Sequence, residues 1–187
     1  MSSTYPNRTD QELLHCLQQG DSAALAELME RYKGLLFTVA RHIVPVEAEA
    51  EELVADFFIG LWEREEALVL HGTFKLYATI SVKNAALNVL KKRRLPTAPF
   101  TAEDTEIRHL EAHDLADDAL RMRELKEEID TFMGTLPRQR KLIFDLSRFQ
   151  GMRHEEIATL LHLHPKTVAN QVALAVQELA KHFQLKG

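Results

Sequence analysis

The side chains best suited to binding another molecule lie near the C-terminus, in a pattern typical of a helix-turn-helix. Apolar residues at Ile157, Leu160 and Leu161 predict one short helix. After a tight break, Pro165 starts a second helix whose apolar face continues from Val168. Its first turns carry polar side chains that can reach phosphates or base edges: Lys166, Thr167, Asn170 and Gln171. Because either amide can pair bidentately with adenine, the pattern predicts duplex DNA as a ligand.

The sequence gives little support for enzymatic or metal chemistry, although it contains nine histidines. His109 and His113 share a helical face, but the residues between them do not form the metalloprotease motif, and no third ligand is placed by sequence. The single cysteine, Cys16, is expected to be a small packed hydrophobe. No glycine-rich phosphate loop, nucleophile elbow or pair of carboxylates emerges. We therefore expect no enzyme activity, no bound metal and no cofactor.

Charge is distributed unevenly along the 187 residues, although the net charge is only −5. Acidic side chains outnumber basic ones 13 to 5 over residues 1–70 and 11 to 4 over residues 101–130. Residues 71–100 carry six basic and no acidic side chains, and residues 131–187 carry eight and four. Since basic segments attract phosphates, this pattern indicates two DNA contacts and a basic partner elsewhere. Solvated helix faces would give the same pattern.

The elements that position these side chains are all expected to be helices. Thr9 and Glu12 form a capping box that opens a first helix, and Asp21 caps a second helix that Pro45 ends. A third helix carries an apolar stripe that runs to Trp62. A fourth spans about residues 74–94, and a further helical group from about residue 120 leads into the helix-turn-helix.

The expected fold is therefore all-α, with two small helical domains joined by a flexible acidic linker. The first domain covers residues 1–94, the linker 95–119, and the second, a helix-turn-helix domain, 120–187. No apolar run approaches the roughly 20 residues that cross a bilayer, and the polar start lacks a signal-peptide core. We expect a cytoplasmic protein with no direct membrane insertion.

Several segments, taken in order and spacing, resemble bacterial sigma factors of the small, two-domain, extracytoplasmic-function type. No single segment is unique to that family, but the combination is specific. The matching residues are 20–28, 31–32, 49–58, 61–63, 83–84, 87–88 and the terminal domain. The resemblance implies that core RNA polymerase and promoter DNA are the partners, with one domain opening the minus-ten element and the other docking on the minus-thirty-five element.

In that family the third helix presents an acidic and apolar face to the polymerase, and this face maps to Glu52, Asp56 and Trp62. Glu52 and Asp56 are four residues apart, so both carboxylates can meet one basic partner. Three apolar side chains of the same helix are expected to turn inward: Leu53, Phe57 and Leu61. An exposed acidic stripe beside a core tryptophan is the alternative interpretation.

The resemblance also implies that the fourth helix and the loop before it read the minus-ten element. Tyr77 can stack on an unpaired base or, equally, be a core aromatic. The candidate contacts on this segment are Lys75, Tyr77, Lys83, Asn84, Asn88, Lys91 and Lys92.

The terminal domain departs from the family in ways that predict weak intrinsic DNA affinity. Ala169, Leu174 and Gln177 stand where basic residues are frequent. His162 occupies a turn position usually taken by glycine, where a left-handed backbone would strain most side chains. Four arginines could contact the DNA backbone or be simple surface charges: Arg138, Arg140, Arg148 and Arg153.

Three functions are compatible with these observations. The first is a sigma factor that binds core polymerase and directs promoter recognition. The second is a sigma-like decoy that binds an anti-sigma protein without engaging promoters. The third, an ordinary helix-turn-helix repressor, fits poorly with the acidic first domain. Since family members are commonly held by an anti-sigma partner, such a protein is a further expected partner.

Overall fold

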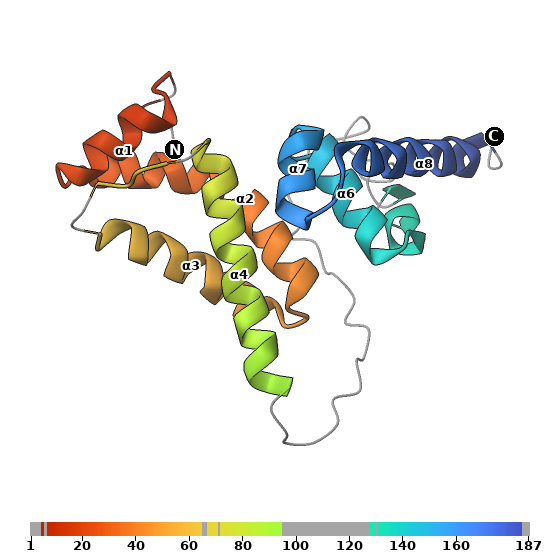
Figure 1. The fold of residues 1–187 in the computed structure, drawn as a ribbon, viewed down its shortest axis with the longest axis horizontal. Helices are drawn as coiled ribbons and strands as arrows, with labels where there is room; N and C mark the ends of the chain where they lie inside the picture. The colour runs from red at the N-terminus through yellow and green to blue at the C-terminus, as the bar shows by residue number, and fades with distance from the viewer. Residues whose placement is uncertain are drawn as a thin grey trace, which may run out of the picture. The chain divides into compact units, whose positions relative to one another are not determined.

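The computed structural model describes residues 5, 7–64, 67–70, 72–94, 128–129 and 131–184, and every regular element among them is a helix. The chain divides into two compact units, Met1–Ala102 and Glu103–Gly187, each with its own helices (Figure 1). The predicted all-α class is confirmed. The predicted linker 95–119, with His109 and His113, lies outside the described residues. Across the described part of the chain, no helix combines the length and apolarity needed to cross a bilayer.

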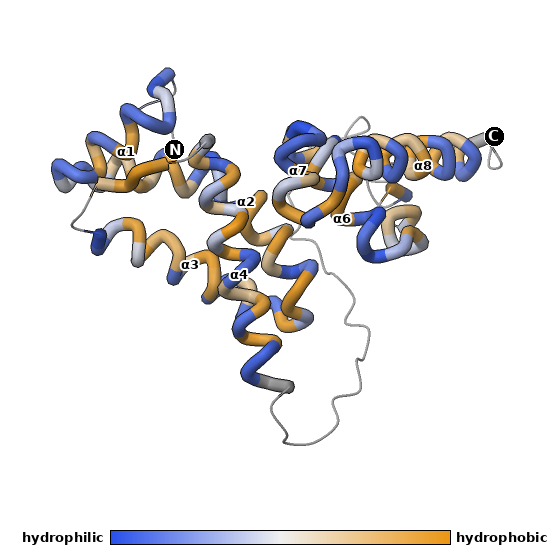
Figure 2. Tube along the Cα trace, in the orientation of Figure 1, coloured by the Kyte–Doolittle hydropathy of each residue, from blue (hydrophilic) through white to orange (hydrophobic). Residues whose placement is uncertain are grey.

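The N-terminal unit has four described helices: α1 (Asp10–Gln18), α2 (Ser22–Ile43), α3 (Glu47–Trp62) and α4 (Phe74–Arg94). Helix α2 packs against the other three, and α3 also packs against α4 (Figure 1). Apolar residues make up much of α3 (Figure 2), and their buried members join the core of this unit. That core includes Leu13, Leu28, Leu36, Val54, Phe58, Phe74 and Val82.

Local signals set the ends of the first two helices. The Glu12 N–H donates to the Thr9 hydroxyl at 3.3 Å, and the Glu12 carboxylate accepts from the Thr9 N–H at 2.7 Å, which completes the predicted capping box. The Asp21 carboxylate accepts from the Ala23 N–H at 2.9 Å at the start of α2. Helix α2 ends at Ile43, before Pro45, as expected.

Arg31 ties the segment before α1 to α2. Its guanidinium forms ion pairs with Glu27, at 2.7 Å, and with Asp10, at 3.3 Å. It also donates to the backbone carbonyls of Arg8, at 2.8 Å, and Tyr5, at 3.0 Å. Since Glu27 is buried, Arg31 supplies the positive charge that its carboxylate needs.

In the C-terminal unit, residues 128–129 and 131–135 are helical and precede α6 (Arg138–Arg148), α7 (His154–Leu161) and α8 (Pro165–Gln184). Helix α8 packs against α6 and α7, and apolar and polar residues alternate along it (Figure 2). The buried side chains of this unit include Phe132, Phe144, Leu146, Ile157, Leu160, Val168 and Ala175.

The turn between α7 and α8 has the left-handed residue that the sequence predicted. His162 has φ 55° and ψ 45°, and the Leu163 N–H donates to the Ala158 carbonyl at 2.9 Å. The ring of His164 then caps α8, because its Nδ1 accepts from the Lys166 N–H at 3.2 Å. The sharp turn fixes the direction in which α8 leaves α7.

Candidate nucleic-acid and protein interfaces

The outer face of α3, which we define as Glu52, Asp56, Ile59, Trp62 and Glu63, combines acidic and apolar side chains. All five are exposed, Ile59 to 52% and Trp62 to 42%. Large apolar side chains beside carboxylates on a helix surface are typical of a protein-binding surface. Trp62 is exposed, so the core tryptophan of the alternative interpretation is wrong, whereas the acidic side chains are exposed as both interpretations expect. Sequence reasoning missed Ile59, although its position seven residues after Glu52 places it on the same face.

The outer face of α3 is adjacent to a groove between α3 and α4, and Asp56 belongs to both. Of the three side chains expected to turn inward, only Leu61 is buried, whereas Leu53 and Phe57 are half-buried. Phe57 nevertheless packs against the core of this unit, and its ring lies next to those of Phe58 and Phe74, so it turns inward as expected, whereas Leu53 is only half-buried at the groove. The groove is lined by Leu53, Asp56, Phe57, Gly60 and Leu61 from α3 and by Tyr77, Ser81, Val82 and Ala85 from α4.

Tyr77 combines the two alternatives that the sequence left open. Its ring centroid lies 6.2 Å from that of Phe57 and 6.3 Å from that of Phe74, so it belongs to an aromatic cluster. The side chain is nevertheless half-buried and lines the groove, and its hydroxyl accepts from Arg64 at 3.2 Å. The ring is therefore held by packing while part of it stays accessible.

The structure brings together most, but not all, of the polar candidates on α4. Helical geometry places Tyr77, Asn84, Asn88 and Lys91 along one face, and the last three are exposed. Lys92 is exposed beside this face. The other two lysines are half-buried on other faces: Lys75 and Lys83. Burial lowers the pKa of the Lys83 ammonium from its ordinary value.

At the start of α8, Lys166, Thr167 and Asn170 are exposed within the first two turns. Arg153 is also exposed, immediately before α7, with its guanidinium 3.4 Å from the Glu156 carboxylate. Side chains in these positions of a helix-turn-helix face base edges and phosphates. The structure thus presents four of the five DNA candidates of this unit to solvent.

The fifth candidate, Gln171, is half-buried and bound by another helix. Arg140 of α6 donates from Nε to Gln171 Oε1 at 3.0 Å, and its Nη1 forms an ion pair with Glu178 at 2.5 Å. Arg140 is therefore neither a free surface charge nor an available phosphate contact. It links α6 to α8, which the sequence did not indicate because Gln171 and Glu178 are distant along the chain.

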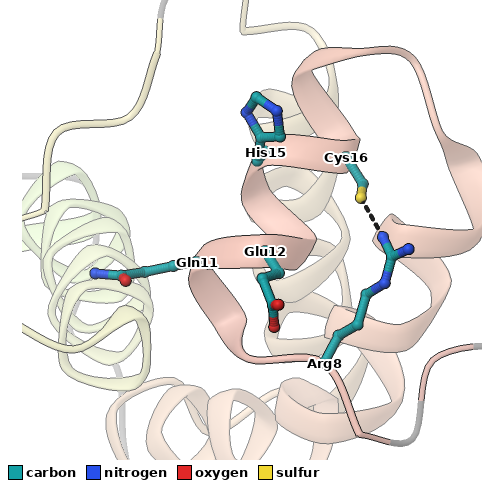
Figure 3. Close-up of a pocket in the computed structure, with 5 residues that line it drawn as sticks. All are labelled: Arg8, Gln11, Glu12, His15 and Cys16. Atoms are coloured by element: carbon teal, nitrogen blue, oxygen red, sulfur yellow. Dashed lines mark hydrogen bonds between the residues drawn. The ribbon is translucent and has the colours of Figure 1, made fainter.

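A shallow pocket on α1 surrounds Cys16 (Figure 3). Its lining residues are Arg8, Gln11, Glu12, His15 and Cys16, and Arg8 Nη1 lies 2.5 Å from Cys16 Sγ. Cys16 is half-buried and packs against the core of the N-terminal unit, as expected. Within the described ranges, no group of three histidine, cysteine or carboxylate side chains is arranged to hold a metal.

Comparison with known families accounts for both units. Residues 28–95 match the model of sigma-70 region 2, and residues 126–179 match that of sigma-70 region 4. The first match contains α3 and α4, and the second contains the helix-turn-helix. Both candidate interfaces therefore fall within matched regions.

Similar proteins match this chain over nearly its whole length. An ECF RNA polymerase sigma-E factor of Haemophilus influenzae is 27% identical, with 94% of this chain and 96% of the relative covered. An RNA polymerase sigma-H factor of Pseudomonas aeruginosa is 24% identical, with 94% of each covered. A solved structure of CnrH in complex with the cytosolic domain of CnrY has the same fold, with TM-score 0.57, 18% identity, and 95% of this chain and 99% of that chain covered.

These matches agree with the family resemblance found in the sequence. They also agree with the expectation that the protein is not an enzyme. A subunit of this kind binds core RNA polymerase and promoter DNA, and it directs transcription initiation. The chain belongs to the extracytoplasmic-function type of RNA polymerase sigma factors.

Proposed function

We propose that this sigma factor binds core RNA polymerase through the outer face of α3. The observation that carries this assignment is the exposure of Ile59 and Trp62 next to Glu52 and Asp56, on a helix whose other side is buried. A basic partner surface can pair with the carboxylates while its apolar side chains cover the exposed rings and methyl groups. Residues 1–70 carry 13 acidic and 5 basic side chains, which also favours a basic partner surface.

Charge reversal tests this surface. Glu52→Lys and Asp56→Lys together should weaken binding to core polymerase at least about tenfold, because each places a cation against a basic partner. Trp62→Ala should weaken binding without changing its salt dependence, since it removes apolar contact. Glu30→Lys is the matched control, because Glu30 is an exposed acid on α2 rather than on α3. Binding is measured by fluorescence anisotropy with labelled chain, and circular dichroism checks the fold.

Unchanged binding of the double charge-reversal variant, with its fold intact, would reject this assignment. If Glu30→Lys and Glu52→Lys weakened binding to core polymerase equally, the effect would come from net charge rather than from a local interface.

We propose that α4 holds the melted minus-ten strand. Tyr77, Asn84, Asn88 and Lys91 follow one face of the helix, and residues 71–100 contain no acidic side chain that would repel phosphates. The half-exposed Tyr77 ring offers a surface for one unpaired base, worth about 1–3 kcal/mol. Lys75, Lys83 and Lys92 add positive charge to the same helix.

We propose that the C-terminal unit docks on the minus-thirty-five element through the start of α8. Lys166, Thr167 and Asn170 are exposed there, and Arg153 adds a cation at the start of α7. In this assignment residues 1–94 form the polymerase and minus-ten domain, residues 95–119 the linker, and residues 120–187 the minus-thirty-five domain.

We also propose that an anti-sigma protein regulates this chain in the cytoplasm. The structurally similar CnrH was solved with the cytosolic domain of CnrY, and here the outer face of α3 and the adjacent groove offer apolar surface for a comparable partner. Transcription by core polymerase plus this chain from a library of random promoters separates a working sigma factor from a decoy. A decoy would bind the anti-sigma protein and support no promoter-dependent transcription.

A further inference from the structure

We propose that Arg64 is a positioning residue, which holds the Tyr77 ring in the place where an unpaired base of the minus-ten strand stacks on it. This inference rests on the proposed function of α4. Arg64 is exposed just after the end of α3, in the segment that leads to α4. It therefore links the end of one helix to an aromatic ring at the start of the next.

Two kinds of contact hold the Tyr77 side chain, and each fixes something different. The ring centroid lies 6.2 Å from that of Phe57 and 6.3 Å from that of Phe74, so packing restricts the plane of the ring. The hydroxyl lies on the axis about which the ring rotates, so a hydrogen bond to it cannot set that plane. Such a bond instead fixes where the far end of the side chain lies, and Arg64 Nη1 donates it at 3.2 Å.

The resulting position suits a surface for stacking. Tyr77 is half-buried, so part of the side chain is packed in the protein and part is accessible at the groove between α3 and α4. Gly60 lines the same groove, and a Cβ added there would meet no atom within 4 Å, so the groove is open at this point. Since a ring that is already held loses less conformational entropy when a base binds, the contact with Arg64 favours stacking.

The exposure of Arg64 means that its bond to Tyr77 contributes most when DNA is bound. In the free protein, water competes for the guanidinium and for the hydroxyl. A base stacked on the ring excludes some of this water, and a charge-assisted hydrogen bond is stronger in drier surroundings. The alternative role for Arg64 is direct contact with a phosphate, and the experiment separates the two.

The test measures binding of single-stranded minus-ten oligonucleotides to the full-length chain in complex with core RNA polymerase, by fluorescence anisotropy. The oligonucleotides come from promoters that the complex selects from a random library. Tyr77→Phe removes only the hydroxyl, and Arg64→Met removes the guanidinium. Each should weaken binding about three- to tenfold. The double variant should bind no more weakly than the worse single variant, because both changes break the same hydrogen bond.

Abasic oligonucleotides give a readout that a merely structural role would not move. Removing one base at a time identifies the nucleotide that stacks on Tyr77, because Tyr77→Ala has no further effect once that base is gone. On this abasic strand, Arg64→Met and Tyr77→Phe should bind as tightly as the wild type, since no stacking remains to be lost.

Two further variants control for the loss of positive charge. Lys33 is an exposed cation on α2, so Lys33→Met is matched to Arg64→Met in charge and should leave oligonucleotide binding nearly unchanged. Lys92 is an exposed cation on α4 that we assign to the strand. Lys92→Met should weaken binding to intact and abasic strands equally, because attraction to phosphates does not depend on the base. Circular dichroism checks the fold of each variant.

Two results would overturn the inference while leaving α4 as the helix that binds the strand. The first is additive losses for Arg64→Met and Tyr77→Phe, with the loss for Arg64→Met persisting on the abasic strand, as a phosphate contact would give. The second is unchanged binding of both variants when Tyr77→Ala binds more weakly, since the ring would then keep its place without Arg64. If Tyr77→Ala and Asn88→Ala also leave binding unchanged, α4 does not hold the strand, and both proposals are rejected.

Discussion

At the scale of single residues, the backbone of His162 adopts a left-handed conformation that favours glycine. It is the one non-glycine residue with positive φ among the described residues, at 55°. A left-handed backbone costs an ordinary residue about 1–2 kcal/mol, whereas the extra unfolded-state entropy of glycine costs about 0.5–1 kcal/mol. His162→Gly should therefore stabilise the C-terminal unit by about 0.5–1 kcal/mol.

Native-state hydrogen exchange of the α7 and α8 amides in the full chain measures this change. His162→Ala is the control, because it removes the imidazole while keeping the strained backbone, and it should give no stabilisation. Equal protection in both variants would show that the imidazole, and not the backbone, determines the stability of this turn.

The Tyr5–Asp21 pair makes a second prediction at this scale. The Tyr5 hydroxyl donates to the Asp21 carboxylate at 2.7 Å, and this hydrogen bond is the main reason that the pKa of Asp21 lies below its ordinary value of 3.8. A lowered folded-state pKa means that the stabilisation is present above about pH 4 and is lost as the pH falls through the folded value.

Tyr5→Phe should therefore reduce the acid sensitivity of the N-terminal unit below pH 4. Trp62 is the only tryptophan, so its fluorescence reports denaturant unfolding of this unit at each pH. If wild type and Tyr5→Phe lost stability in parallel on acidification, Asp21 would not be responsible.

At the scale of elements, Arg31 attaches the segment before α1 to α2. Arg31→Met would remove the 2.7 Å ion pair between Arg31 and the buried Glu27 carboxylate and the bonds to two backbone carbonyls. Losing one partner of a buried pair costs about 3–5 kcal/mol. Because the Arg31 side chain is 25% exposed, we expect roughly 2–3 kcal/mol here.

Urea unfolding followed by Trp62 fluorescence measures the loss. Arg31→Lys should be intermediate, since an ammonium can keep the ion pair with Glu27 but not the fork of bonds to the carbonyls. A variant Arg31→Met as stable as the wild type would show that water replaces the guanidinium at no cost.

At the scale of the whole molecule, two small units share one chain of net charge −5. The N-terminal helices and the C-terminal helix-turn-helix each have a separate core, and the exposed cations on α8 and before α7 are few. DNA affinity grows with the number of phosphates that cations neutralise, so each unit alone should bind weakly. We expect selective promoter binding only when both units are bound to one polymerase. Once one unit is bound to the promoter, the other acts at high effective concentration.

The free chain should accordingly bind a promoter duplex only at micromolar or weaker affinity, with little sequence preference, whereas the complex with core polymerase should select promoters. Fluorescence anisotropy at two salt concentrations compares the two states. Tight, sequence-specific binding by the free chain would instead indicate an ordinary repressor.

The sequence by itself determined the helices and their ends, because these depend on neighbours within about four residues. The capping box at Thr9 and Glu12, the cap at Asp21, the start of α8 at Pro165 and the left-handed turn at His162 all follow from local backbone rules. The all-α class and the family followed from the order of these elements.

Only the tertiary structure decided which side chains meet. Arg140 reaches Gln171 and Glu178 across 31 and 38 residues, and Arg31 reaches Tyr5 across 26. Leu53 and Phe57 have the spacing of core residues, yet both are only half-buried and line the groove between α3 and α4. A periodic pattern shows which face of a helix is apolar, but the partner and the depth of burial depend on how the faces of several helices fit together.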